Sequence, residues 1–164
     1  MSVRAFITAL CLTVTPWGAA LAQGADIAFG GIKADTSLPV EVTADQLTVN
    51  QTDGTATFSG NVVVAQGEMR LGADEILVEY GPEGQNRIER LIATGNVILT
   101  SGPDAAKADS AEYAVDTGEI VMAGSVLLTQ GASAISGETL SLNLSAGTGQ
   151  MGGRVKTVLQ PGGN

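Results

Sequence analysis

The sequence contains no histidine, and its only cysteine is Cys11. A chain without imidazole or a second thiol cannot build a Ser-His or Cys-His nucleophile, a zinc site of the usual ligands or an internal disulfide. Aromatic residues make up only 4% of the chain, so a core must come from aliphatic side chains, and platforms for stacking on sugars are scarce. The sequence therefore predicts neither an enzyme nor a bound cofactor or metal.

Paired carboxylates would be the remaining route to catalysis, because two acids can hydrolyse a glycosidic bond. Asp74 and Glu75 are the closest such pair. Neighbours along a strand point to opposite faces, so these two groups are not expected to meet. The recurring acids Asp45, Asp74 and Asp109 are better explained as strand-start residues that cap backbone amides.

Basic residues are also few, with 8 Lys and Arg against 17 Asp and Glu and a net charge of −9. A nucleic-acid-binding protein needs a basic surface to neutralise phosphates, and so does a protein that docks on an anionic membrane. The composition argues against both partners. It is typical of a protein kept soluble by its charge.

The only long apolar run is Ala5–Val14, which follows Arg4 and ends before Pro16. Together with Ala20-Leu21-Ala22 it has the pattern of a cleaved export signal, and an uncleaved anchor is the alternative. Cleavage before Gln23 would leave 164 − 22 = 142 residues without cysteine. We expect a signal peptide at 1–22, a flexible arm at 23–37, one β-domain at 38–160 and a disordered tail at 161–164, in an exported protein.

Apolar and polar residues alternate with period two along most of this predicted domain. Val40, Val42 and Ala44 alternate with polar residues, and so do Leu140, Leu142 and Leu144. A strand sends successive side chains to opposite faces, so each run has one apolar face. Glycine-rich turns, among them Ser59-Gly60-Asn61, separate the runs. The pattern predicts an all-β sandwich, barrel or solenoid.

A motif recurs four times along these strands. An acid opens each unit at Asp45, Asp74, Asp109 and Glu138, and a glycine step follows at 60, 95, 124 and 153, which gives intervals of 15, 21, 15 and 15 residues. The longer interval contains a turn insertion at 81–86. A repeat of this size indicates stacked supersecondary units that share one core.

A stack of this kind has two ends with unpaired strand edges, which can accept a strand from another chain. The alternative is that flanking arms cover both edges. The first strand, 39–43, and the last, 155–160, carry the candidate residues for edge-strand assembly: Val40, Glu41, Val42, Val155, Thr157 and Val158.

The inward faces are aliphatic, and they would form a core in a closed sandwich or line an apolar groove in an open one. Periodicity alone favours the core and does not exclude the groove. The candidate groove residues are Val62, Val64, Met69, Leu71, Ile76, Val78, Val97, Leu99, Ile120, Met122, Val126, Leu128, Leu140 and Leu142.

The motif series is similar to that of the LptA/OstA-like family of periplasmic lipopolysaccharide-transport proteins. The resemblance rests on the ordered segments 42–47, 58–62, 69–74 and 92–97, which carry Ala-Asp and Gly-Asn-Val steps. It covers about residues 38–130 and extends weakly to 159. One departure is the scarcity of basic residues for lipid A phosphates, so we assign no phosphate clamp.

The resemblance implies a repeat-built, antiparallel β-jellyroll or solenoid that is slightly twisted and open in section like a V. It implies a lipopolysaccharide carrier located in the periplasm that shields acyl chains in an apolar groove. Copies would pair head to tail and bridge an LptC-like component of the inner membrane to an LptD-like component of the outer membrane. The alternative is a structural or adhesin-like exported solenoid without lipid cargo. A calcium-binding repeat would need denser Asp and Gly.

Overall fold

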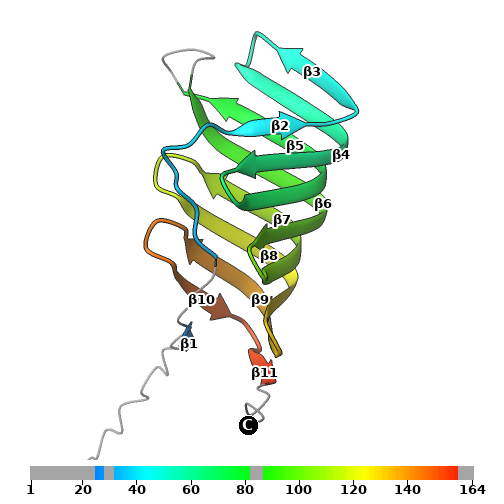
Figure 1. Cartoon of the computed structure of the whole chain (residues 1–164). Helices are drawn as coiled ribbons and strands as arrows, with labels where there is room; N and C mark the ends of the chain where they lie inside the picture. The colour runs from blue at the N-terminus through cyan, green and yellow to red at the C-terminus, as the bar shows by residue number, and fades with distance from the viewer. Residues whose placement is uncertain (1–24, 28–31, 82–86, 159–164) are drawn as a thin grey trace, which may run out of the picture.

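The computed structural model describes residues 25–27, 32–81 and 87–158, and over these residues it contains β-strands and no α-helix (Figure 1). The described part accordingly includes no helix that is long and apolar enough to cross a membrane. The predicted signal peptide at 1–22 and the predicted tail at 161–164 lie outside the described residues. The strands are β1 (Ala25–Ile27), β2 (Glu41–Thr43), β3 (Gln46–Asn50), β4 (Thr55–Gln66), β5 (Met69–Tyr80), β6 (Ile88–Ser101), β7 (Asp104–Ala114), β8 (Glu119–Gln130), β9 (Ser133–Asn143), β10 (Thr148–Gly152) and β11 (Lys156–Val158).

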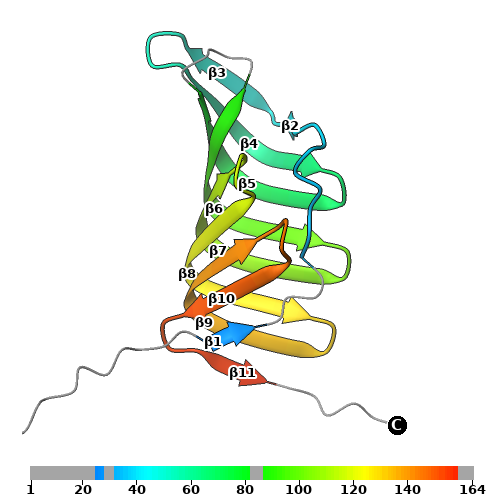
Figure 2. The same ribbon diagram turned by 90° about the vertical axis from the view of Figure 1, so that its left-hand side faces the viewer.

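All strands belong to one antiparallel sheet in the order β1-β10-β9-β8-β7-β6-β5-β4-β2, with β3 paired to β4 and β11 paired to β9. From β4 to β10 each strand pairs with its neighbours in sequence, so the sheet is a series of hairpins (Figure 2). In the described part, β1 and β2 do not pair with each other, and the sheet is therefore not closed into a barrel. The all-β, antiparallel prediction is confirmed.

The glycine steps are bulges inside long strands. Our prediction of a turn at Gly60-Asn61 is wrong, because β4 runs without interruption from Thr55 to Gln66. Gly60 and Asn61 have φ values of 79° and 48°, and the register shifts between Ser59 and Val62. A positive-φ glycine next to a polar residue serves a bulge as well as a turn, so the sequence signal is ambiguous.

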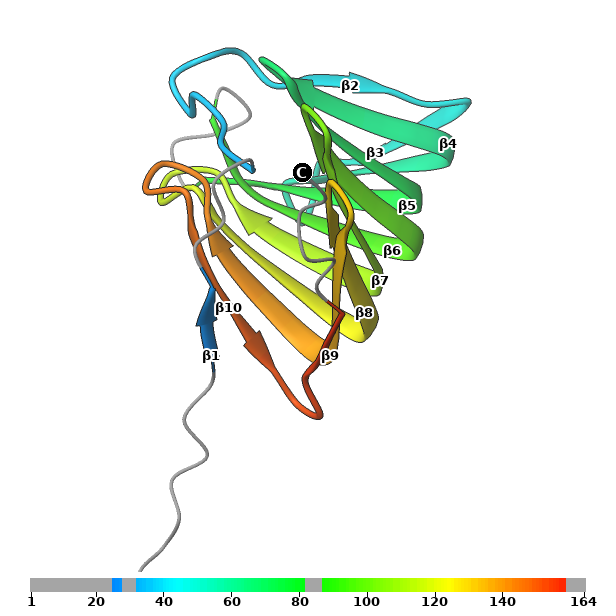
Figure 3. The same cartoon turned by 60° about the horizontal axis from the view of Figure 1, so that its bottom comes forward.

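The same bulge recurs at Gly95-Asn96 in β6 and at Gly124-Ser125 in β8. At each site two residues on one strand lie opposite one acidic residue on the neighbouring strand. A bulge bends its strand, and here the bends stack to form one crease along which the sheet folds back on itself (Figure 3). The sequence repeat is thus one hairpin with one bulge.

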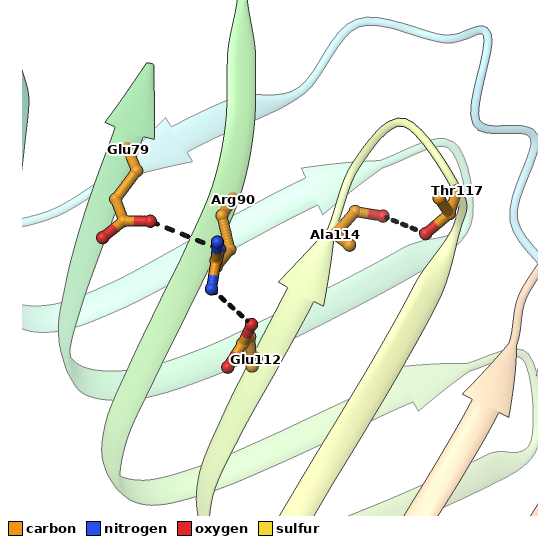
Figure 4. Close-up of polar contacts among 5 residues, drawn as sticks. All are labelled: Glu79, Arg90, Glu112, Ala114 and Thr117. Carbon is orange, nitrogen blue, oxygen red and sulfur yellow. Dashed lines mark hydrogen bonds and ion pairs between the residues drawn. The ribbon is translucent and has the colours of Figure 1, made fainter. Parts of the chain in front are cut away.

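Folding at the crease brings two apolar faces together. The buried hydrophobic side chains form one cluster that runs from Ala56 on β4 to Met151 on β10. The outer face is polar by comparison. There the Arg90 guanidinium lies 3.3 Å from a Glu79 carboxylate oxygen and 2.9 Å from one of Glu112, and the three residues bridge β5, β6 and β7 (Figure 4).

Candidate functional site

The fourteen candidate groove residues all lie between the two faces of the folded sheet. Each belongs to one of the long strands β4, β5, β6, β8 or β9, and none is more than 3% exposed. The period-two pattern therefore assigns their side chains to the interior face. Their low exposure also means that the faces pack against each other, so a long ligand could enter only if the faces separated.

The crease holds the recurring acids on its outer side. Asp45 accepts a hydrogen bond of 2.8 Å from the Asn61 side-chain amide, and Asp74 accepts one of 2.7 Å from Asn96. The strand-start expectation is wrong for Asp74 and Asp109, which lie within β5 and β7. These acids have a structural role, as we expected, but they bind the bulge of the next strand instead of capping amides.

The bulge glycines leave room for these acids. A Cβ at Gly95 would lie 2.5 Å from Asp74 Oδ2 and 3.0 Å from Asp74 Cβ. Side chains do not tolerate contacts this short. The acid and the glycine therefore form one unit, which explains why they recur together in the sequence.

Opposite the crease, the two faces end in two rows of hairpin tips that we call the first and second rim. The first rim consists of the tips between β4 and β5, β6 and β7, and β8 and β9. The second includes the tips between β7 and β8 and between β9 and β10. We call the border of the fold between the two rims the mouth (Figures 1 and 3).

One buried polar pair crosses the mouth. The Tyr113 hydroxyl, at the end of β7, donates a 2.6 Å hydrogen bond to the side-chain oxygen of Gln66, at the end of β4. Both residues are buried. Burial among apolar side chains disfavours the phenolate and raises the pKa of Tyr113 to about 12. The pair is therefore a neutral hydrogen bond at physiological pH.

A segment of the same chain, residues 32–38, lies along the mouth, and we call it the strap. The Gln66 side-chain amide donates to the carbonyls of Thr36 and Leu38 at 3.2 and 2.9 Å. The Ser101 hydroxyl donates to the carbonyl of Lys33 at 3.0 Å. The side chain of Ile32 is 1% exposed and belongs to the core cluster. These contacts fix the strap to the first rim.

The strap also reaches the second rim. A Cβ at Gly118 would lie 3.0 Å from the Thr36 methyl carbon, and one at Gly147 would lie 3.0 Å from Lys33 Cγ. Beside the strap is an open depression of about 430 Å³, lined by strap residues, by Gly67 and Glu68 of the first rim and by Leu144 and Ser145. The strap thus touches both rims and covers the mouth.

Sequence reasoning missed Gln66, Ser101 and the strap, although a signal for the first two was present. Val62, Val64 and Gln66 share one face of β4, and Val97, Leu99 and Ser101 share one face of β6. In both strands a polar residue ends an inward apolar series, six residues after the bulge glycine. Such a residue must find a hydrogen-bond partner once it is buried.

The edge-strand candidates lie at the two ends of the sheet. Glu41 and Val42 belong to β2, Val40 precedes it, Thr157 and Val158 belong to β11, and Val155 precedes that strand. Sequence reasoning did not single out β3, whose Leu47 and Val49 are 53% and 48% exposed. It also did not anticipate β1, which pairs with β10 at the end where β11 lies.

A family model described as LptA/(LptD N-terminal domain) LPS transport protein matches residues 41–148. A protein of Rhizobium meliloti (strain 1021) that is described as uncharacterized is 30% identical over 154 residues, which cover 87% of this chain and 82% of the relative. The lipopolysaccharide export system protein LptA of Escherichia coli (strain K12) is 32% identical over 60 residues, 35% of this chain and 32% of that protein. The LPS-assembly protein LptD of Actinobacillus pleuropneumoniae serotype 5b (strain L20) is 35% identical over 82 residues, 48% of this chain and 10% of that protein.

The fold is similar to the crystal structure of LptH, the LptA-homologous periplasmic component of the lipopolysaccharide transport device of Pseudomonas aeruginosa. The TM-score is 0.69 at 20% sequence identity, and the match covers 78% of this chain and 99% of LptH. This likeness concerns the fold, whereas the family model concerns the sequence and spans most of the chain. The chain therefore belongs to the family of lipopolysaccharide transport proteins that comprises LptA and the N-terminal domain of LptD.

Proposed function

We propose that this protein carries lipopolysaccharide across the periplasm and shields its acyl chains between the two apolar faces of the folded sheet. The observation that carries the proposal is the continuous aliphatic interior, which runs from β4 to β10 along the whole crease. Acyl chains gain about 25 cal/mol for each Å² of apolar surface that leaves water. Aliphatic walls without fixed polar groups let such a chain slide along the fold.

The filled interior specifies how lipid would enter. All fourteen candidate residues are nearly inaccessible in the described structure, so acyl chains must replace contacts between the two faces. The crease supplies the hinge, because its bulges bend the strands while the segments on either side of each bulge keep their pairing with the neighbouring strands. Opening at the mouth would expose both faces to the same ligand.

The terminal strands are the proposed sites of head-to-tail assembly. In the described part, β2 and β3 pair only with β4, which leaves strand edges at one end of the fold. The other end carries β1 and β11. Pairing these ends would continue one sheet through successive copies, and through LptC-like and LptD-like partners at the two membranes.

Assembly is tested by placing charge on the exposed edge. Lysines on an edge strand oppose pairing with another chain. We expect Leu47→Lys/Val49→Lys to remain monomeric at concentrations where the unchanged protein forms larger species in sedimentation velocity. A protein that stays monomeric from micromolar to millimolar concentration, with and without lipopolysaccharide, would contradict head-to-tail pairing.

The transport proposal is tested by photo-crosslinking in cells that make lipopolysaccharide. A photoreactive residue replaces Leu128, which is fully buried, or Leu127, which is adjacent on β8 and 39% exposed on the outer face. We expect a lipopolysaccharide adduct at position 128 and none at 127. Equal labelling at both positions would indicate surface contact only.

A structural solenoid without lipid cargo is the second candidate, and the filled interior favours it. That function predicts no adduct at Leu128 or at any other inward position. The two faces of the folded sheet would then stay packed against each other throughout. No catalytic step enters either proposal.

A further inference from the structure

The mouth contains hydrogen-bond donors, and in the described structure they are occupied by backbone carbonyls of the strap. Gln66 donates to Thr36 and Leu38, and Ser101 donates to Lys33. The strap presents carbonyls near the aliphatic side chain of Ile32. An acyl ester or amide likewise presents a carbonyl beside an aliphatic group. We infer that the strap is an internal substitute for the acylated end of the lipid, and that Gln66 and Ser101 bind the acyl carbonyls once the strap is displaced. This inference rests on the proposed function.

The position of the donors supports this assignment. Both residues end an inward apolar series at the first rim, where an acyl chain lying in the interior would join its polar headgroup. The Tyr113 hydroxyl donates to the Gln66 oxygen and so orients the Gln66 amide group toward the strap. A buried amide that loses the strap carbonyls must find other acceptors. Ester and amide carbonyls of the lipid supply them at the same depth.

The strap is also built to detach. Its described attachments include three side-chain hydrogen bonds to the first rim and the packing of Ile32 and Ala34 against the core, and the strap is not a strand of the sheet. Asp35 and Ser37 form a local turn, in which the Ser37 backbone amide donates to Asp35 at 3.0 Å. A short segment with few fixed contacts can leave the mouth without disturbing the ladder between the long strands.

A reversible tether tests whether the strap must leave. A Cβ added at Gly147 would lie 3.0 Å from Lys33 Cγ, which marks where the sulfur of a cysteine at position 33 would be. In a disulfide with an S–S bond of about 2.05 Å, each Cβ lies about 3 Å from the sulfur of the other cysteine. The full chain carrying Cys11→Ser, Lys33→Cys and Gly147→Cys thus has one possible disulfide. We expect the oxidised protein to capture purified lipopolysaccharide at least about tenfold less than the same protein after reduction.

Equal capture by the oxidised and reduced forms would overturn the inference while leaving the proposed function intact. No capture by the unchanged protein, together with no adduct at Leu128, would instead remove the proposed function. Mass spectrometry reports whether the disulfide has formed. Because Gly147 has a φ of 66°, the cysteine there is strained, so a second set of variants without a disulfide is also needed.

Gln66→Leu and Gln130→Leu form that set. Gln130 occupies the same place in its repeat, six residues after the bulge glycine, but it donates to Asp104 at 3.2 Å. Gln66→Leu should free the strap and remove the acyl-carbonyl donor. Hydrogen exchange at residues 33–38 should therefore speed up, capture should be faster, and release should rise by about tenfold because hydrogen bonds to the lipid are lost. Gln130→Leu should change none of the three.

The combined readout separates binding from structure. A merely structural Gln66 would speed exchange without changing the release rate of lipopolysaccharide, and that result would overturn its role as a lipid donor. Equal effects of Gln66→Leu and Gln130→Leu on capture and release would overturn the role of the strap. Faster exchange and faster release in Gln66→Leu alone is the result that supports both parts of the inference.

Discussion

The crease and the mouth are opposite borders of the same folded sheet, and they are held in different ways. The crease repeats one unit, in which an acid lies against a bulge glycine on the next strand. The mouth is held by contacts that occur once, between Gln66, Tyr113 and the strap. Repeated local contacts make a border stable, whereas single long-range contacts can be exchanged for a ligand. The comparison indicates that the crease is the hinge and the mouth is the moving part.

The largest effect is expected at the crease. Gly95→Val puts a β-branched residue at a φ of 77° and a Cβ against Asp74. The combined backbone strain and clash should lower the free energy of unfolding by about 3 kcal/mol. Urea denaturation measures this loss.

Gly102→Val is the matched control, because Gly102 has a φ of 56° in a hairpin and open space around it. Gly102→Val has the same backbone strain but no clash. Its loss in the free energy of unfolding should therefore be smaller than that of Gly95→Val by about 1 kcal/mol or more. Equal losses in the two variants would show that the acid does not tighten the crease.

The next effect is expected at the mouth. Tyr113→Phe removes the donor to Gln66 and leaves a buried amide oxygen without its partner. The cost should be about 1–3 kcal/mol. Hydrogen exchange should show faster opening of the strap and unchanged protection near the bulges. Equal acceleration at both borders would contradict their independence.

Tyr113 also predicts a pH dependence. Its folded pKa of about 12 lies above the ordinary value of 10, so the folded state retains a proton that the unfolded state loses. The stabilisation is complete below pH 10 and falls as the pH rises from 10 to 12, by up to about 1.4 kcal/mol per pH unit. Denaturation of Tyr113→Phe at the same pH values should lack this component. A parallel pH dependence in the two proteins would argue that Tyr113 is not the titrating group.

A smaller effect tests the repeated unit. Ser125 has a φ of 47° at the position that asparagine occupies in the other two bulges, and the described structure has no hydrogen bond between Ser125 and Asp109. Asparagine tolerates this backbone conformation and would reach the acid. Ser125→Asn should therefore stabilise the fold by about 0.5–1 kcal/mol in thermal or urea denaturation. A destabilised variant would mean that the third bulge differs from the first two.

The smallest effect is expected on the outer face, which belongs to neither border. Arg90→Gln breaks the contacts with Glu79 and Glu112, whose side chains are substantially exposed. Solvent screening limits such pairs to below about 1 kcal/mol. The loss should shrink further at high salt, as measured by denaturation at two ionic strengths. A loss in the free energy of unfolding as large as that of Tyr113→Phe would contradict the view that contacts at the crease and the mouth stabilise the fold more than contacts on the outer face.

Period-two alternation predicted the all-β fold and the inward faces, because it reports which side of a strand is buried, and the family resemblance predicted the antiparallel arrangement. The sequence also revealed the repeat, since Gly60, Gly95 and Gly124 serve the same bend. It misread Gly60 as part of a turn, because a bulge and a turn both use positive φ. To see that the strands continue through the bulges, one would have to follow which side chains lie on each face of the strand before and after the glycine.

The mouth could not be predicted, because its contacts join distant residues that share no pattern. Gln66 and Tyr113 are 47 positions apart, and Ser101 and Lys33 are 68 apart. The local sequence of residues 32–38 is like that of a polar arm. The segment is recognised as the strap from the burial of Ile32 and from its hydrogen bonds with the donors at the first rim. The groove residues were identifiable as inward-facing, but their close packing depends on how far the sheet folds at the crease.

The most direct test of opening at the mouth is a pair of distance measurements, one across the mouth and one along the first rim, each made with and without lipopolysaccharide. Spin labels at Glu68 and Thr117 report across the mouth, and labels at Glu68 and Pro103 report along the first rim; the three positions are exposed. If the protein opens at its mouth, lipopolysaccharide widens the first distance and leaves the second unchanged. Binding of lipopolysaccharide with no change in the first distance would contradict a carrier that opens at its mouth.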